Sequence, residues 1–141
     1  MNAKLSLLVL DPKLRRLRLG VAMTMYAAIL IMGSIPGARA EIGHYATGVV
    51  LHSVAYGILA FLTFTGSTGS AARRALKAVL AVALMGAADE LVQSMFPYRG
   101  AAVGDWLVDC SAAAVTAAAL WAWLPEPVLP APPSVPNSPT V

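Results

Sequence analysis

The stretch DELVQSMFPYRGAAVGDWLVD, residues 89–109, decides how this chain folds. It holds four carboxylates and one arginine, although only 12% of the chain is charged and 58% is hydrophobic. Pro97, Gly100 and Gly104 interrupt it between two long apolar runs, which predicts a short turn between two antiparallel helices. The stretch therefore predicts that the scarce charges meet at one end of a helix pair.

The rest of the chain has the composition of a membrane protein. Its mean hydropathy is +0.70, and its charged fraction is far below the quarter that is typical of soluble domains. A helix needs about 17 to 25 apolar residues to cross a bilayer. Four runs meet this length: residues 19–35, 45–65, 76–96 and 105–124. Asp11 and Pro12 begin the first helix upstream, as N-cap and first helical residue. We predict an all-α integral membrane bundle of four transmembrane helices.

Lysine and arginine placement predicts the orientation of this bundle. Basic residues crowd the N-terminal flank and the connection between the second and third runs, whereas the other two connections hold one arginine each. The crowded segments should be cytoplasmic, so both termini lie inside a bacterial inner (cytoplasmic) membrane that the chain crosses in multiple passes. The basic residues concerned are Lys4, Lys13, Arg15, Arg16, Arg18, Arg73, Arg74 and Lys77.

Three segments follow from this topology. Residues 1–18 form a basic cytoplasmic segment, residues 19–124 form the membrane domain, and residues 125–141 form a tail with seven of the ten prolines. Such a tail stays extended or disordered. One alternative is that residues 1–40 are a signal peptide cleaved after Ala40, within Ala38-Arg39-Ala40. The first apolar run of 17 residues exceeds the usual signal-peptide length of about 7 to 15, so we expect it to be retained.

In this topology, three helices bring polar side chains into one layer near the outer face. At 1.5 Å per residue, His52, Glu90 and Asp109 lie roughly 6 to 10 Å from the outer ends of their helices. Ionisable groups inside a bilayer turn toward partners, and the small residues of the third and fourth helices allow close packing. The candidate residues form what we call the polar cluster: His52, Tyr56, Glu90, Gln93, Arg99, Asp105 and Asp109.

Several of these residues have simpler interpretations. Arg99 either pairs with Glu90, Asp105 or Asp109, in the simplest case as a structural ion pair, or stays partly free to bind a phosphate or carboxylate. Asp105 is also a plausible helix N-cap. His52 is alternatively a packing histidine bonded to Gln93 or to neighbours of Tyr56.

Asp89 is left outside the polar cluster. We expect it on a different helical face from Gln93, where it pairs with a lipid headgroup or with another helix.

The segments HSVAYGIL, ELVQSMFPYR and DWLVD occur in an order that resembles the VanZ-like family of small polytopic bacterial membrane proteins. The resemblance covers residues 42–120. Matching positions are His52, Tyr56, Leu59, Glu90, Gln93, Pro97, Arg99 and Asp105. Gly48 and Val49 stand where members carry aspartate and lysine, Asp109 stands for an asparagine, and Ala112 stands for a glycine. We hypothesise that Asp109 replaces the aspartate that the second helix lacks.

The family is associated with teicoplanin resistance, so the resemblance implies a role at the cell envelope without a settled biochemical activity. We expect a non-enzymatic protein whose polar cluster engages a membrane lipid, an envelope precursor or a lipoglycopeptide antibiotic. One alternative is a small intramembrane enzyme with Glu90 or Asp109 as base and His52 as acid or orienting partner. Another is proton-coupled transport through the layer of His52, Glu90 and Asp109, which four helices would support as a dimer. We expect no cofactor, no metal and no nucleic-acid partner, and association into a homo-oligomer stays open.

Overall fold

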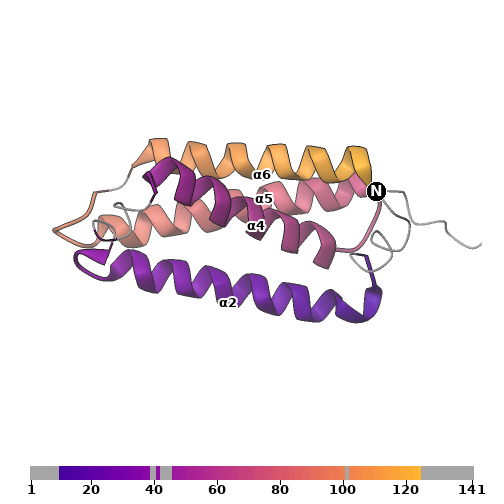
Figure 1. The fold of residues 1–141 in the computed structure, drawn as a ribbon, viewed down its shortest axis with the longest axis horizontal. Coiled ribbons are helices and arrows are strands. Elements are labelled where there is room, and N and C mark those ends of the chain that lie inside the picture. The colour runs from indigo at the N-terminus through magenta and orange to yellow at the C-terminus, as the bar shows by residue number, and fades with distance from the viewer. Residues whose placement is uncertain (1–9, 39–40, 42–45, 101, 125–141) are drawn as a thin grey trace, which may run out of the picture.

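The computed structural model describes residues 10–38, 41, 46–100 and 102–124 (Figure 1). All regular elements in these ranges are helical, which confirms the all-α prediction. They are the 3-10 turn η1 (Pro12–Leu14) and the α-helices α2 (Arg15–Ser34), α4 (Gly48–Gly66), α5 (Ala71–Ser94) and α6 (Val103–Trp123). Successive helices run in opposite directions and form an elongated bundle (Figure 1). The alternative cleavage site after Ala40 and the tail 125–141 lie outside the described residues.

Three helical segments of the described chain are long and apolar enough to cross a membrane. They are Pro12–Ser34, Gly48–Gly66 and Val103–Trp123. Helix α5 has 24 residues and is therefore long enough, but it carries five charges near its two ends. Eleven uncharged residues separate Lys77 from Asp89. The structure thus supports a membrane protein, and the crossing of the bilayer by α5 stays a prediction.

Side-chain caps explain where most of the helices begin. The Asp11 carboxylate accepts the Lys13 N–H at 2.9 Å, as predicted for this N-terminus. Thr47 Oγ1 accepts the N–H of Val50 at the start of α4, and Ser70 Oγ does the same for Arg73 at the start of α5. Helix α6 lacks such a local cap, since its N-cap residue is an alanine. Its first turn therefore depends on another helix.

The core lies between α4, α5 and α6, with α2 packed against α4 and α5. Leu59 of α4, Val82 of α5 and Ala113 of α6 are all fully buried. Alanines at the contacts of α5 and α6, such as Ala78 and Ala117, let the two backbones approach closely. The small residues therefore act as predicted.

Two long-range hydrogen bonds attach neighbouring helices to the backbone of α5. Tyr26 Oη in α2 donates to the Met85 carbonyl at 3.0 Å, and Trp106 Nε1 in α6 donates to the Ala83 carbonyl at 3.0 Å. Both donors belong to aromatic side chains that bury a large apolar ring and keep one polar atom paired. They hold α2 and α6 at defined rotations about their own axes relative to α5.

Candidate functional site

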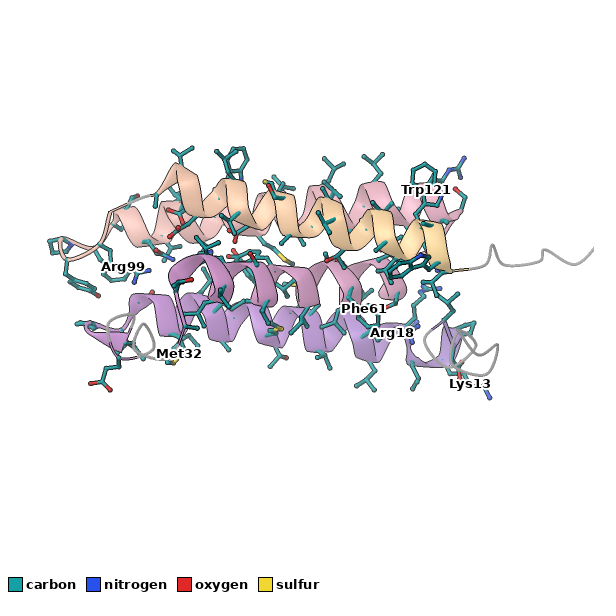
Figure 2. All side chains as sticks on the ribbon, turned by 45° about the horizontal axis from the view of Figure 1, so that its top comes forward. Lys13, Arg18, Met32, Phe61, Arg99 and Trp121 are labelled. Carbon is teal, nitrogen blue, oxygen red and sulfur yellow. The ribbon has the colours of Figure 1, made fainter. Side chains whose placement is uncertain are left out.

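The polar side chains gather where α4 begins, α5 ends and α6 begins. Figure 2 shows Arg99 at this end of the bundle, and Lys13, Arg18 and Trp121 at the opposite end. The α5–α6 connection turns at Phe96, whose carbonyl accepts the Arg99 N–H at 3.0 Å. Three helix termini and one connection therefore build the site.

His52 lies between two aspartates of α6. Its Nδ1 is 2.8 Å from Oδ1 of Asp109, which is fully buried, and its Nε2 is 3.7 Å from Oδ2 of Asp105. Asp105 and Asp109 are four residues apart and so share one face of α6. A protonated imidazole carries an N–H on each nitrogen and a positive charge that complements the two carboxylates.

This arrangement bears on two of the alternatives. His52 contacts Asp109, so the predicted bond to Gln93 is wrong, whereas a histidine paired with a buried carboxyl group still fits the packing interpretation. Asp105 is the third residue of α6 and Ala102 is its N-cap, so the N-cap interpretation of Asp105 is wrong. As an acidic residue in the first helical turn, Asp105 still interacts favourably with the helix dipole.

Asp89 belongs to the site, in contrast to the expectation from the sequence. It is 1% exposed, and its Oδ2 accepts the Tyr56 hydroxyl at 3.0 Å, so the expected partner on another helix is present. The expected separation from Gln93 is wrong, because a Cβ at Gly33 of α2 would lie 3.6 Å from Asp89 Oδ1 and 3.3 Å from Gln93 Nε2. Residues four apart share one face of a helix, so the spacing of Asp89 and Gln93 in the sequence already indicates that Asp89 lies beside the polar cluster.

The rings of His52 and Tyr56 link the two aspartate contacts. They are stacked, with centroids 5.7 Å apart and an interplanar angle of 4°. Tyr56 is buried and donates to Asp89 on α5, whereas His52 contacts Asp109 on α6. These two side chains, which lie one turn apart on α4, therefore join α5 to α6.

Glu90 and Arg99 do not pair with each other. Glu90 Oε2 accepts the backbone N–H of Ala102 and thereby caps α6 from α5, where a negative charge complements the helix dipole. Arg99 Nη2 donates to Gln93 Oε1. The structure gives Arg99 no ion pair with a carboxylate of the described residues, so it does not show the alternative in which Arg99 pairs with Glu90, Asp105 or Asp109, and it agrees with the partly free guanidinium. Its Nε lacks a hydrogen-bond partner.

A pocket of about 210 Å³ opens between α2, α4 and α5 beside these groups. It divides the predicted cluster: His52, Tyr56, Gln93 and Arg99 line the pocket, whereas Glu90, Asp105 and Asp109 lie outside its lining. Asp89 also lines it, and Asp89 Oδ1 is a buried atom without a hydrogen-bond partner. The pocket therefore has an unpaired acceptor at Asp89 and an unpaired donor at Arg99.

The connection that carries Arg99 is attached to α2. Tyr98 Oη donates to the carbonyl of Ser34, the last residue of α2, at 2.6 Å. We expect Tyr98→Phe to lower the free energy of unfolding by about 0.5 kcal/mol, at the low end for one hydrogen bond because the side chain is exposed. Equilibrium unfolding in detergent measures this change. A loss of several kcal/mol would contradict the assignment, since phenylalanine keeps the ring contact with Phe96.

In the part of the chain that the structure describes, no three His, Cys, Asp or Glu side chains are grouped so that they could hold a metal ion. The groups of the site can form hydrogen bonds and recognise charge through one guanidinium, one imidazole and buried carboxyl groups. Comparison with known proteins finds no matching family model, no matching curated protein and no matching solved structure.

Proposed function

We propose that this chain is a VanZ-like integral membrane protein of the bacterial inner membrane, which acts at the cell envelope by binding rather than by catalysis. Its pocket engages a membrane lipid, an envelope precursor or a lipoglycopeptide antibiotic from the outer side. The observation that carries this proposal is the pocket itself. Polar groups of α4, α5 and the α5–α6 connection converge on it, and Asp89 Oδ1 and Arg99 Nε keep hydrogen-bonding capacity for a ligand.

The distribution of charge supports four crossings with both termini in the cytoplasm. Lys13 and Arg18 lie at the end of the bundle opposite Arg99 (Figure 2). Arg73, Arg74 and Lys77 belong to the first turns of α5, which begins at that same opposite end (Figure 1). Under the positive-inside rule this end faces the cytoplasm, so the pocket opens outward.

The test is teicoplanin susceptibility in a sensitive host that expresses the wild-type chain or Arg99→Ala. We expect the wild type to raise the inhibitory concentration and Arg99→Ala to leave it at the level of the empty vector. The physical reason is that Arg99 is the pocket's only arginine or lysine among the described residues, and it has the geometry to recognise phosphate or carboxylate.

Arg73→Ala is the matched control, because it removes the same charge from an exposed position at the opposite end of the bundle. It should protect as well as the wild type. Membrane abundance of all three proteins is measured by quantitative immunoblot. The proposal would be contradicted if Arg99→Ala is abundant in the membrane and protects as well as the wild type. If the wild type does not change the inhibitory concentration, the antibiotic is excluded as the ligand.

One observation keeps catalysis as the second candidate. His52 lines the pocket and contacts Asp109 at 2.8 Å, which is the geometry of a carboxylate that orients an acid or base. Glu90 is a weaker candidate base than the sequence indicated, because it caps α6 and lies outside the pocket lining. Turnover of a lipid-linked substrate by the purified protein, lost in Asp109→Asn, would favour an enzyme over a binding protein.

A further inference from the structure

The unpaired acceptor of the pocket is buried. Asp89 is 1% exposed, its Oδ2 is occupied by the Tyr56 hydroxyl, and its Oδ1 has no partner. Buried polar atoms in proteins are nearly always paired, by protein, water or ligand. Because Asp89 lines the pocket, a hydrogen-bond donor that enters the pocket is well placed to supply the missing partner. A primary ammonium group has three such donors and the complementary charge.

The unpaired donor belongs to Arg99, which is held by a residue one helical turn beyond Asp89. Gln93 follows Asp89 by four residues, or roughly 6 Å along the helix, and Gln93 Oε1 holds the Arg99 guanidinium through one of its nitrogens. The remaining N–H groups of Arg99 suit a phosphate, which guanidinium binds through parallel hydrogen bonds. A ligand with only an anion leaves Asp89 unpaired, and one with only an amine leaves Arg99 unpaired. A zwitterion with a short spacer satisfies both.

The size and the walls of the pocket restrict the ligand further. Its volume of about 210 Å³ lies below the roughly 300 to 1,000 Å³ of pockets that enclose drug-sized molecules, so it fits a headgroup and not the body of an antibiotic. Ile29 and Met32 of α2 form part of its wall, and Met32 is also exposed on the outside of the bundle. An acyl chain can therefore leave the pocket along α2 toward lipid.

We propose that this pocket binds a phosphoethanolamine headgroup, with the phosphate at Arg99 and the ammonium at Asp89, carried by a membrane lipid. This assignment rests on the proposed binding function and specifies its ligand class. Of the three ligands in the proposed function, it favours the membrane lipid over the antibiotic. A phosphocholine group lacks N–H donors for Asp89, and a phosphoglycerol group lacks the cation, so both bind more weakly.

The experiment measures the melting temperature of the purified full chain in detergent while short-chain lipids are titrated. A ligand that binds only the folded state raises the melting temperature in proportion to its saturation. We expect dihexanoyl phosphatidylethanolamine to act at concentrations at least tenfold lower than its phosphatidylcholine and phosphatidylglycerol counterparts. Equal effects of the three lipids would overturn the assignment. Soluble phosphoethanolamine as effective as the lipid would support the zwitterion and overturn the lipid source.

Two glycines of α2 offer a matched pair of variants. A side chain at Gly33 enters the pocket, since its Cβ would already lie 3.3 Å from Gln93 Nε2, whereas a Cβ at Gly20 meets nothing within 4 Å. Gly33→Leu should abolish the lipid-dependent shift and Gly20→Leu should keep it. A normal shift in Gly33→Leu would place the ligand elsewhere.

Asp89→Asn decides the matter if Gly33→Leu fails to fold. The amide keeps the shape of the carboxyl group but removes its charge, so the preference for phosphatidylethanolamine over phosphatidylglycerol should disappear. A retained preference would overturn the role of Asp89. If the chain binds phosphatidylethanolamine selectively but gives no protection against the antibiotic, the headgroup assignment stands and the antibiotic branch of the proposed function fails. If the chain protects but does not distinguish the three headgroups, only the headgroup assignment is overturned.

Discussion

Replacement of His52 by alanine should destabilise the purified protein by about 3 to 5 kcal/mol, the loss seen when one partner of a buried ion pair is removed. Asp109 is fully buried, and its Oδ2 already lacks a hydrogen-bond partner. The contact with His52 Nδ1 at 2.8 Å is thus the hydrogen bond that the structure gives this carboxyl group. Without the imidazole, the charge of Asp109 has no nearby compensation, because Asp105 on the same face is also acidic. Equilibrium unfolding in detergent measures the loss.

A double-mutant cycle separates this effect from the lost packing of the histidine ring. Asp109→Asn removes the buried charge, and the VanZ-like pattern itself has asparagine at this position. The variant with both substitutions should be more stable than His52→Ala alone, with a coupling energy of the order of 1 to 3 kcal/mol. Additive losses in the two single variants would contradict a direct interaction between these side chains.

Gly86→Ala should destabilise the bundle by about 1 to 3 kcal/mol, which is typical of an extra methyl group in a closely packed interior. A Cβ at this position of α5 would lie 2.8 Å from Asp109 Oδ2 and 3.1 Å from Trp106 Cδ1. Neither neighbour is free to retreat, since Asp109 contacts His52 and Trp106 donates to the Ala83 carbonyl. We therefore expect α6 to shift and the His52–Asp109 contact to lengthen.

Gly104→Ala is the control for Gly86→Ala. It makes the same chemical change within the neighbouring helix, where a Cβ meets nothing within 4 Å. Alanine is favoured over glycine in helices by up to about 1 kcal/mol, so this variant should be as stable as the wild type or more stable. Thermal unfolding of both variants in the same detergent tests the pair. Equal stability of the two would mean that α5 and α6 are not in close contact at Gly86.

The partners of the polar residues were harder to predict than their position in the bundle. The sequence brought His52, Glu90 and Asp109 to one end of the helices, and the structure places their side chains there. For Arg99 the sequence left open a carboxylate partner or a partly free guanidinium, and the structure pairs Arg99 with Gln93 while Glu90 caps α6. Glu90 can accept the N–H of Ala102 only after the α5–α6 connection has folded and brought the two residues together. No pattern in the sequence predicts this contact.

Asp89 illustrates the same difficulty in a single side chain. The sequence analysis placed it on a different helical face from Gln93, and the rotation of α5 in the bundle decides otherwise. That rotation depends on Gly86 against Asp109 and on the hydrogen bonds that Tyr26 and Trp106 make to the α5 backbone. Long-range contacts of this kind are specific to one packing arrangement.

The sequence by itself determined the helical class, the start of the first helix at Asp11, the approximate bounds of four helices, and the end of the bundle at which the charges meet. These properties follow from run length, capping chemistry and the helical rise, all of which act along one chain segment. Only the tertiary structure decided the pairs His52–Asp109, Tyr56–Asp89 and Gln93–Arg99, and the pocket beside them. The physical reason is that a hydrogen bond depends on ångström-scale distance and direction, and these are set by how the helices rotate and pack against one another.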